Sequence, residues 1–211
     1  VEKGGAAPGS TANRFIVREE PILSYSSHIQ NEGWQNYVSD GALSGTVGES
    51  KRLEALKVRL DTQPYEGAVA YCADVQGLGW QGWSQNDILT GTTGMGKYLE
   101  AVKIKLTGEM AEYYDIYYRV HTQNYGWLDW AANGAAAGTE DYDYRIEAVE
   151  IKIVPKGEAA PGNTSRAFVK KPSFVLGPNW TVEQGYFQAT SGIRYYVGGS
   201  YIIVSIAQQK M

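Results

Sequence analysis

The feature that most constrains the fold of this 211-residue chain is a segment that occurs three times in tandem. Each copy holds a Gly-Trp pair, and these pairs begin at Gly33, Gly79 and Gly126, which are 46 and 47 residues apart. Each copy also holds a Gly-Thr pair and, eight residues after the Thr, a Glu-Ala pair. A repeat of this length is one supersecondary unit that needs its neighbours to close a core. We therefore expect the three copies to fold as one body.

Both ends of every copy alternate between apolar and polar residues, which is the pattern of β-strands. In the first copy, "LSYSSHIQ" places Leu23, Tyr25 and Ile29 on one face, and "EALKVRL" closes the copy with the same alternation. Two short strands lie between these segments, joined by a turn at Asp40-Gly41, a dipeptide typical of hairpins. No long stretch has helical periodicity. The expected fold class is all-β.

Two long strands that enclose a short hairpin, three times over, favour a pseudo-threefold closure of three four-stranded repeats. A β-trefoil-like closure is the preferred model, and a β-prism with three four-stranded sheets stays open as the alternative. The repeats are expected at about residues 22–62, 68–108 and 115–154, within a domain of residues 21–154.

The flanking segments differ in composition from the repeats. Residues 1–15, "VEKGGAAPGSTANRF", resemble residues 154–168, "VPKGEAAPGNTSRAF". Both are rich in Gly, Ala, Pro and Ser, which predicts a linker at 155–172 and a linker, or the tail of a preceding unit, at 1–20. Residues 173–211 hold alternating apolar segments and predict a small β-rich C-terminal segment of about four strands.

The repeated motifs carry a resemblance. A His-x-Gln, a Gly-Trp, a Gly-Thr-x-Gly and a Leu-Glu-Ala alternation make the copies similar to the ChW repeat, the clostridial hydrophobic repeat named for its Trp. The resemblance covers about residues 22–153. It implies a bacterial module that is extracellular or displayed on the cell surface and that serves adhesion or the binding of glycans or cell wall. This chain departs from the pattern at Asp74, which replaces the His, and at Asp141, which replaces a Gly.

Composition excludes several classes of partner. The formal net charge is −4 and no run of Lys or Arg exceeds two residues, which argues against nucleic acid as a partner. No apolar segment approaches the ~18 residues of a transmembrane helix, so no membrane insertion is expected. The single Cys72 excludes a cysteine-based zinc site, and we expect neither a metal nor a cofactor.

Three quasi-equivalent shallow sites are the candidate ligand-binding surfaces. In each, a polar pair of the first strand is combined with an aromatic residue that follows the Gly-Trp pair, because an exposed aromatic ring beside polar groups suits a sugar or a protein partner. The predicted site residues are His28, Gln30 and Tyr37 in the first copy, Asp74, Gln76 and Trp83 in the second, and His121, Gln123 and Trp130 in the third.

Two further sets are expected to be structural. The Gly-Trp tryptophans fit buried hairpin plugs, and the repeated glutamates, each alone on an apolar strand face, must be paired or hydrogen-bonded. These residues are Trp34, Trp80 and Trp127, and Glu54, Glu100 and Glu147. A glycosidase needs two carboxylates across one substrate, which three symmetry-related glutamates do not provide.

The function expected from the sequence is therefore a non-enzymatic binding module. Its expected partner is a glycan, a cell-wall polymer or a host surface protein, and residues 169–211 are a candidate for self-association. The alternative is a structural or assembly protein of a surface layer, a fibre or a virion.

Overall fold

The computed structural model describes residues 22–172, 180–183, 186–189, 194–198 and 201–204. The chain divides into two compact units, Val1–Lys171 and Pro172–Met211. The first unit holds the three repeats, and its described part consists of β-strands and the loops between them, with one short helix, α1 (Met110–Tyr113).

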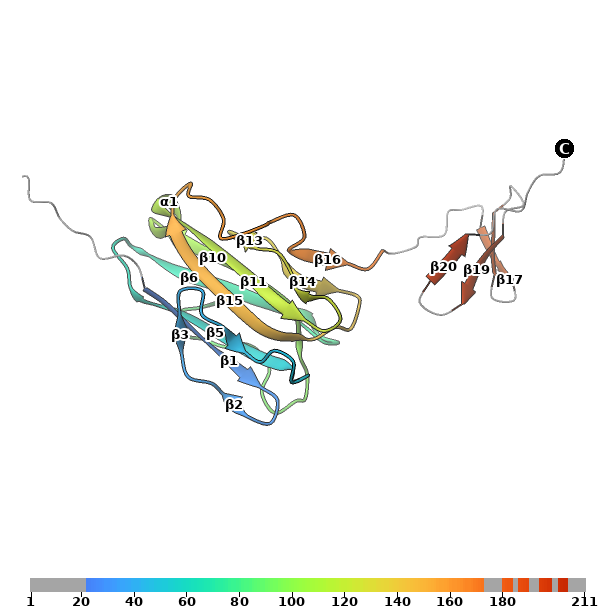
Figure 1. Ribbon diagram of the computed structural model, residues 1–211, viewed down its shortest axis with the longest axis horizontal. Coiled ribbons are helices and arrows are strands. Elements are labelled where there is room, and N and C mark those ends of the chain that lie inside the picture. The colour runs from blue at the N-terminus through green and yellow to red at the C-terminus, as the bar shows by residue number, and fades with distance from the viewer. Residues whose placement is uncertain (1–21, 173–179, 184–185, 190–193, 199–200, 205–211) are drawn as a thin grey trace, which may run out of the picture. The chain divides into compact units, whose positions relative to one another are not determined.

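A pair of long antiparallel strands frames each repeat. These pairs are β1 (Ile22–Ile29) with β5 (Leu53–Thr62), β6 (Gly67–Val75) with β10 (Leu99–Gly108), and β11 (Tyr114–Thr122) with β15 (Ile146–Pro155). Figure 1 shows β10, β11 and β15 side by side in the body of the unit.

Three short strands lie between the long strands of each repeat. They are β2 (Gly33–Trp34), β3 (Val38–Ser39) and β4 (Ser44–Gly45); β7 (Gly79–Trp80), β8 (Ser84–Gln85) and β9 (Thr90–Gly91); and β12 (Gly126–Trp127), β13 (Ala131–Ala132) and β14 (Ala137–Glu140). The first two of each set pair with the first long strand of their own repeat.

The third short strand leaves its own repeat and pairs with the last long strand of another. Strand β9 of the second repeat pairs with β5 of the first, β14 of the third pairs with β10 of the second, and β4 of the first pairs with β15 of the third. Every repeat thus gives one strand and receives one, in a cyclic order. The repeats cannot close their sheets alone, as the repeat period predicts.

This exchange explains why Gly-Thr and Glu-Ala recur together. Gly91 has φ +98°, and a Cβ on it would lie less than 3.0 Å from the carbonyl oxygen of Glu54 and from Ala55 of the neighbouring repeat. Thr92 N–H donates to that same Glu54 carbonyl at 2.9 Å. The equivalent glycines of the other two repeats, Gly45 and Gly138, also have positive φ and meet the backbone of the equivalent Glu-Ala pairs. The two motifs are the two sides of one inter-repeat contact.

One hydrophobic core is shared by all three repeats. Its largest fully buried side chains are Tyr25, Tyr71 and Tyr118, which sit at equivalent positions. Each phenol donates to a backbone carbonyl 17 residues further on; for Tyr71 this is Ile88, at 2.6 Å. Burial raises the pKa of Tyr71 to about 12. These tyrosines fix each hairpin to the core.

The all-β class is found, but none of the sheets closes into a barrel in the part of the chain that the structure describes. The barrel of the trefoil-like model is therefore not observed. The three sheets stay separate and are connected by the exchanged strands.

The segment after the third repeat, residues 156–171, is here called the strap. Its composition predicts a linker, but it forms strand β16 (Phe168–Lys170), which adds in parallel to β14. At its start, Lys156 Nζ lies 2.7 Å from Asp115 Oδ1, and Gly157 N–H donates to Asp115 Oδ2 at 2.9 Å. The strap is a bound part of the repeat unit.

The second unit contains a four-stranded antiparallel sheet in the order β17-β18-β19-β20. Its strands are β17 (Trp180–Glu183), β18 (Tyr186–Ala189), β19 (Arg194–Gly198) and β20 (Tyr201–Val204). Residues 173–179, at the start of the segment predicted to be β-rich, lie outside the described residues.

Candidate functional site

In the first and third repeats, the repeated glutamate is the centre of a charged cluster. Glu54 is buried; its Oε1 accepts from Arg52 Nε at 2.8 Å, and its Oε2 lies 3.0 Å from His28 Nδ1. In the third repeat, Glu147 has the equivalent partners Arg145, at 2.7 Å, and His121, at 3.1 Å. The Arg guanidinium compensates the buried carboxylate and the His ring contacts it, as the cost of burying a charge requires.

The second repeat lacks both partners. Asp74 stands where the others have His, and Tyr98 stands where they have Arg. Burial, followed by the nearby carboxylates Asp74, Asp143, Asp141 and Glu140, raises the pKa of Glu100 to about 7. The prediction that each repeated glutamate is paired or hydrogen-bonded is wrong for Glu100, whose Oε1 is buried without a partner.

These carboxylates surround a cavity of about 280 Å³ between the second and third repeats, here called the acidic pocket. The second repeat gives Asp74, Glu100 and Trp80, and the turn after β14 gives Asp141 and Asp143. No group of three or more His, Cys, Asp or Glu among the described residues has the geometry to hold a metal ion.

The Gly-Trp tryptophans lie on the surface beside these clusters. Trp34 pairs with His28 across β1 and β2, with the two rings edge to face at 5.4 Å. It is 38% exposed, and Trp80 and Trp127 are half-buried. The prediction that these residues are buried plugs is wrong, because two-residue strands at a sheet edge leave one side of the ring uncovered. The hairpins are held instead by the buried tyrosines.

The later aromatics differ from repeat to repeat. Trp83 is 46% exposed and Tyr37 is half-buried, whereas Trp130 is 7% exposed. The prediction that Trp130 is the exposed member of its pair is therefore wrong. A basic side chain lies over each ring: Arg59 over Tyr37 at 4.0 Å and Lys105 over Trp83 at 4.4 Å. Arg119 lies over Trp130 at 5.0 Å and over Trp127 at 4.6 Å.

A groove of about 500 Å³ crosses the hairpin of the first repeat. The half-exposed ring of Trp34 and the exposed side chain of Leu43 give it apolar walls, and Gln35 and Asn36 add amide groups. We call it the first groove; its remaining lining residues are Glu32, Val38 and Gly45.

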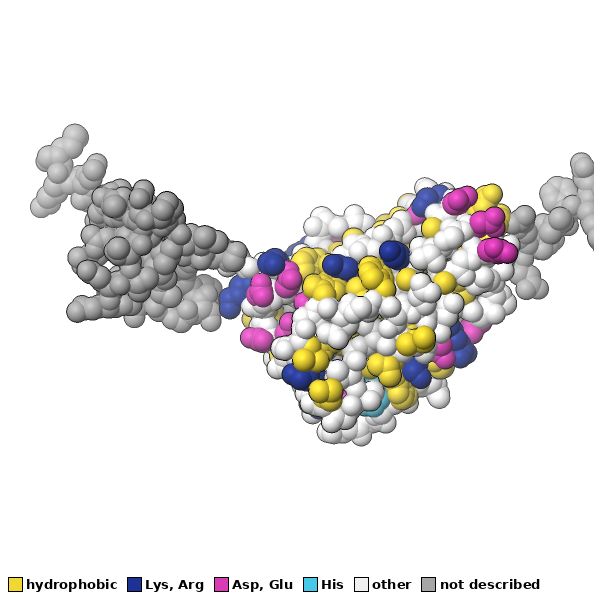
Figure 2. Space-filling model, turned by 180° about the vertical axis from the view of Figure 1, so that it is seen from behind, with side chains coloured by type: hydrophobic (Ala, Val, Ile, Leu, Met, Phe, Trp, Pro, Cys, Tyr) yellow, Lys and Arg dark blue, Asp and Glu magenta, His cyan; other side chains and the backbone are white. Residues whose placement is uncertain are grey.

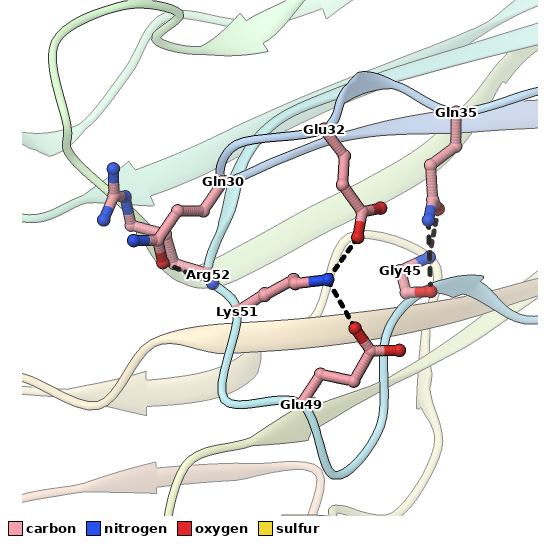
Figure 3. Close-up of polar contacts among 7 residues, drawn as sticks. All are labelled: Gln30, Glu32, Gln35, Gly45, Glu49, Lys51 and Arg52. Carbon is pink, nitrogen blue, oxygen red and sulfur yellow. Dashed lines mark hydrogen bonds and ion pairs between the residues drawn. The ribbon is translucent and has the colours of Figure 1, made fainter.

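Polar contacts fix the shape of the first groove (Figure 3). Gln35 Oε1 accepts from Gly45 N–H at 2.7 Å, and Lys51 lies between the carboxylates of Glu32 and Glu49. The sequence reading named none of these four side chains. Gln35 and Glu32 do not belong to the repeated motif, because the third repeat has Leu128 and Tyr125 at the equivalent positions.

The corresponding face of the third repeat is filled by the strap. Gly162 packs against Trp130, and Asn163 accepts from Trp130 N–H at 2.8 Å. Asp129 Oδ2 accepts from Arg166 N–H at 2.8 Å, and Gly138 N–H donates to Ala167 at 3.0 Å. Asp129 and Gly138 are the counterparts of Asn36 and Gly45 in the first groove. In the third repeat an extended segment therefore covers the surface that corresponds to the first groove. In the first repeat this surface is open.

Comparison with known families agrees with the internal repetition. The family model described as Clostridial hydrophobic W, ChW, matches residues 28–62, 75–108 and 121–155. The three repeats are ChW repeats. Neither a curated protein nor a solved structure gives a match.

Each predicted trio of site residues is divided between two places on its ChW repeat. In the first, His28 lies at the Glu54 end of the strand pair, and Tyr37 lies under Arg59 and donates to Asp87 of the second repeat. The glutamines have a backbone role in all three ChW repeats: the N–H groups of Gln30, Gln76 and Gln123 donate to the carbonyls of Arg52, Tyr98 and Arg145, each at 3.0 Å.

The surface of the ChW unit carries further apolar side chains in separate patches (Figure 2). The large exposed ones are concentrated in the first two repeats; they are Trp34, Leu43, Val47, Leu78, Trp83, Ile88, Leu89, Met95 and Tyr113. None lies on the hairpin of the third repeat in the described part of the chain, because Leu128 and Trp130 are buried there. Among the helices described, none is long and apolar enough to span a membrane.

Proposed function

We propose that the chain is a non-enzymatic, extracellular or surface-displayed module that binds glycan or cell-wall polymer through the open hairpin faces of its first two repeats. The observation that carries the proposal is the first groove, where the ring of Trp34 lies beside the amide of Asn36, while the amide of Gln35 is bonded to Gly45. Sugar-binding sites use this combination, because an aromatic face stacks on the C–H groups of a sugar ring and amides bond its hydroxyls.

The second repeat supports the same proposal with a different aromatic. Trp83 is exposed, and Lys105 lies over its ring at 4.4 Å. The third repeat does not contribute in this proposal, because the strap lies across the equivalent surface. The three sites expected from the sequence thus become two.

The test is binding of the full chain to isolated bacterial cell walls and to a glycan array. We expect Trp34→Ala to weaken binding at least about tenfold, as losses of well-placed aromatic contacts do. Because the ring also contacts His28 and Lys57, the melting temperature should fall slightly. Tyr113→Ala is the matched control, since Tyr113 is an exposed aromatic outside the first groove. Equal binding by the two variants would contradict the proposal.

A second candidate function, self-assembly, is favoured by the strap. It shows that an extended segment of this chain fits the hairpin face of a ChW repeat and adds a strand to it. Strand addition is a recurring mode of peptide recognition. In the third repeat β14 is paired with β16, whereas the equivalent strands β4 and β9 are the edge strands of their sheets. Concentration-dependent association in size-exclusion chromatography, abolished by mutation at the first groove, would favour this function over glycan binding.

The finer arrangement that we propose for the fold is prism-like. The cyclic exchange of β4, β9 and β14 and the single shared core support three sheets around one axis.

A further inference from the structure

The three ChW repeats provide an internal comparison at the site of the buried glutamate. In two of them a His and an Arg contact the carboxylate. In the second repeat both positions have changed, to Asp74 and Tyr98, so a His and an Arg are replaced by one additional carboxylate and one phenol.

The two carboxylates of the second repeat are buried without a direct polar partner. Asp74 is 5% exposed and Glu100 is 8% exposed. No hydrogen bond or ion pair joins either side chain to another residue in the part of the chain that the structure describes, and Glu100 Oε1 is buried without a partner. Burying charge in this way is costly unless a partner of opposite charge is bound.

The nearby cations are engaged elsewhere. Lys170 pairs with Glu140 at 2.9 Å, and Lys103 lies over the ring of Trp80 at 3.9 Å. The acidic pocket next to Glu100 has a volume of about 280 Å³, against about 30 Å³ for one water molecule. It therefore has room for a charged group with several attached heavy atoms.

We propose that the acidic pocket binds a protonated primary amine, whose ammonium group is held by Asp74 and Glu100. An ammonium group has three donors and a positive charge, which match the unpartnered oxygens of two adjacent carboxylates. A metal ion fits less well, because the described carboxylates do not form a metal-ligand group. The amine is one carried by an amino sugar or by a lysine side chain.

This inference is independent of sugar stacking in the first groove, since neither Trp34 nor Trp83 lines the acidic pocket. The two proposals can therefore fail separately.

Binding should depend on pH, because the pKa of Glu100 is raised to about 7. Protonated Glu100 does not attract a cation, so affinity for a lysine-type amine, whose own pKa is about 10.4, should rise as pH increases through about 7. The charged and titratable groups that face Asp74 and Glu100 are Glu140, Asp141, Asp143, Tyr98, Lys103 and Lys170.

The experiment is an NMR titration of the full-length, nitrogen-15-labelled chain at a pH of about 7.5, just above the raised pKa of Glu100. The probes are glucosamine and Nα-acetyl-lysine amide, each compared with its counterpart acetylated on the amine. We expect saturable shifts of the Trp80 indole signal and of the Gly77 and Gly79 amides with one or both amines, and none with the acetylated compounds. Stronger binding of glucosamine would indicate an amino sugar as the natural ligand, and stronger binding of Nα-acetyl-lysine amide would indicate a lysine side chain.

Three variants locate the binding. Asp74→Asn and Glu100→Gln should each weaken it about tenfold or more, as the loss of one partner of a buried charge pair does. Glu112→Gln removes an exposed charge outside the acidic pocket and should leave it unchanged. The double variant Asp74→His with Tyr98→Arg recreates the arrangement of the other repeats, and we expect it to fold and to lose amine binding.

The proposal is overturned if neither amine binds, or if the acetylated probes bind as well as the free amines. Amine binding that survives in the double variant would overturn it too, as would Ca²⁺ or Mg²⁺ shifting the Trp80 signal where both amines fail.

Discussion

Replacing each repeated glutamate by glutamine should give opposite results in different repeats. Glu54→Gln and Glu147→Gln remove the acceptor of an Arg and a His, and we expect each to lower the free energy of unfolding by about 1–3 kcal/mol. Glu100→Gln removes a buried charge that has no such partners. At a pH of about 8 it should therefore raise the stability of the repeat unit.

The size of this gain follows from the pKa. The pKa of Glu100 rises from its ordinary value of 4.5 to about 7, and one unit corresponds to about 1.4 kcal/mol, which gives an upper bound of about 3 kcal/mol. Because the acidic pocket is open to water, which screens charge, we expect about 1–2 kcal/mol. Since the folded state holds this proton more tightly than the unfolded state, the wild type loses stability as pH rises from 4.5 to about 7.

The assay is chemical denaturation of the three variants and the wild type at a pH of about 4.5 and again above 7, the two limits set by Glu100. The advantage of Glu100→Gln over the wild type should be present at the higher pH and small at the lower one. Glu112→Gln provides the control for loss of one exposed charge. If Glu100→Gln destabilised the protein as much as Glu54→Gln at the higher pH, the reasoning about unpaired charge in the second repeat would be refuted.

Three further predictions concern the framework. Gly91→Ala places a Cβ against the Glu54 carbonyl at a positive φ and should cost about 2–5 kcal/mol in denaturation experiments, whereas Gly82→Ala, with nothing within 4 Å, should cost less than about 1. Trp130→Ala should lower stability by about 3–5 kcal/mol because the ring is buried under the strap, and thermal melts should show Trp83→Ala close to wild type. Tyr71→Phe leaves the Ile88 carbonyl without its donor and should lower the free energy of unfolding by about 1–3 kcal/mol. A thermal melt identical to that of the wild type would show that this hydrogen bond does not anchor the hairpin.

The sequence predicted the parts of the fold that depend on local alternation. The long strands, the buried Tyr25, Tyr71 and Tyr118, and the shared core all follow from apolar residues at every second position. The exchange of β4, β9 and β14 could not be predicted, because periodicity says which residues are buried but not which strand they meet. The coupling of Gly-Thr to Glu-Ala was visible as recurrence, but its cause is a contact between repeats.

The errors at the candidate site have physical causes. The predictions that Trp34 is buried and that Trp130 is exposed are wrong for two reasons. Strands of two residues are too short for the alternation of faces to hold from the first aromatic to the second, and the strap buries Trp130. The strap was predicted to be a linker because of its composition. It binds the third repeat mainly through backbone hydrogen bonds, which do not depend on the identity of the side chains and so leave no pattern in the sequence. The difference at Glu100 was readable: alignment of the repeats places Asp74 and Tyr98 where the others have His and Arg.

The most direct test of the proposed function follows the tryptophan indole signals while soluble cell-wall glycan fragments are added to the labelled chain. Binding through the open hairpin faces predicts that the signals of Trp34 and Trp83 shift saturably, while that of Trp130, under the strap, stays in place. Shifts of Trp130 without shifts of Trp34 or Trp83 would contradict the assignment of binding to the first two repeats.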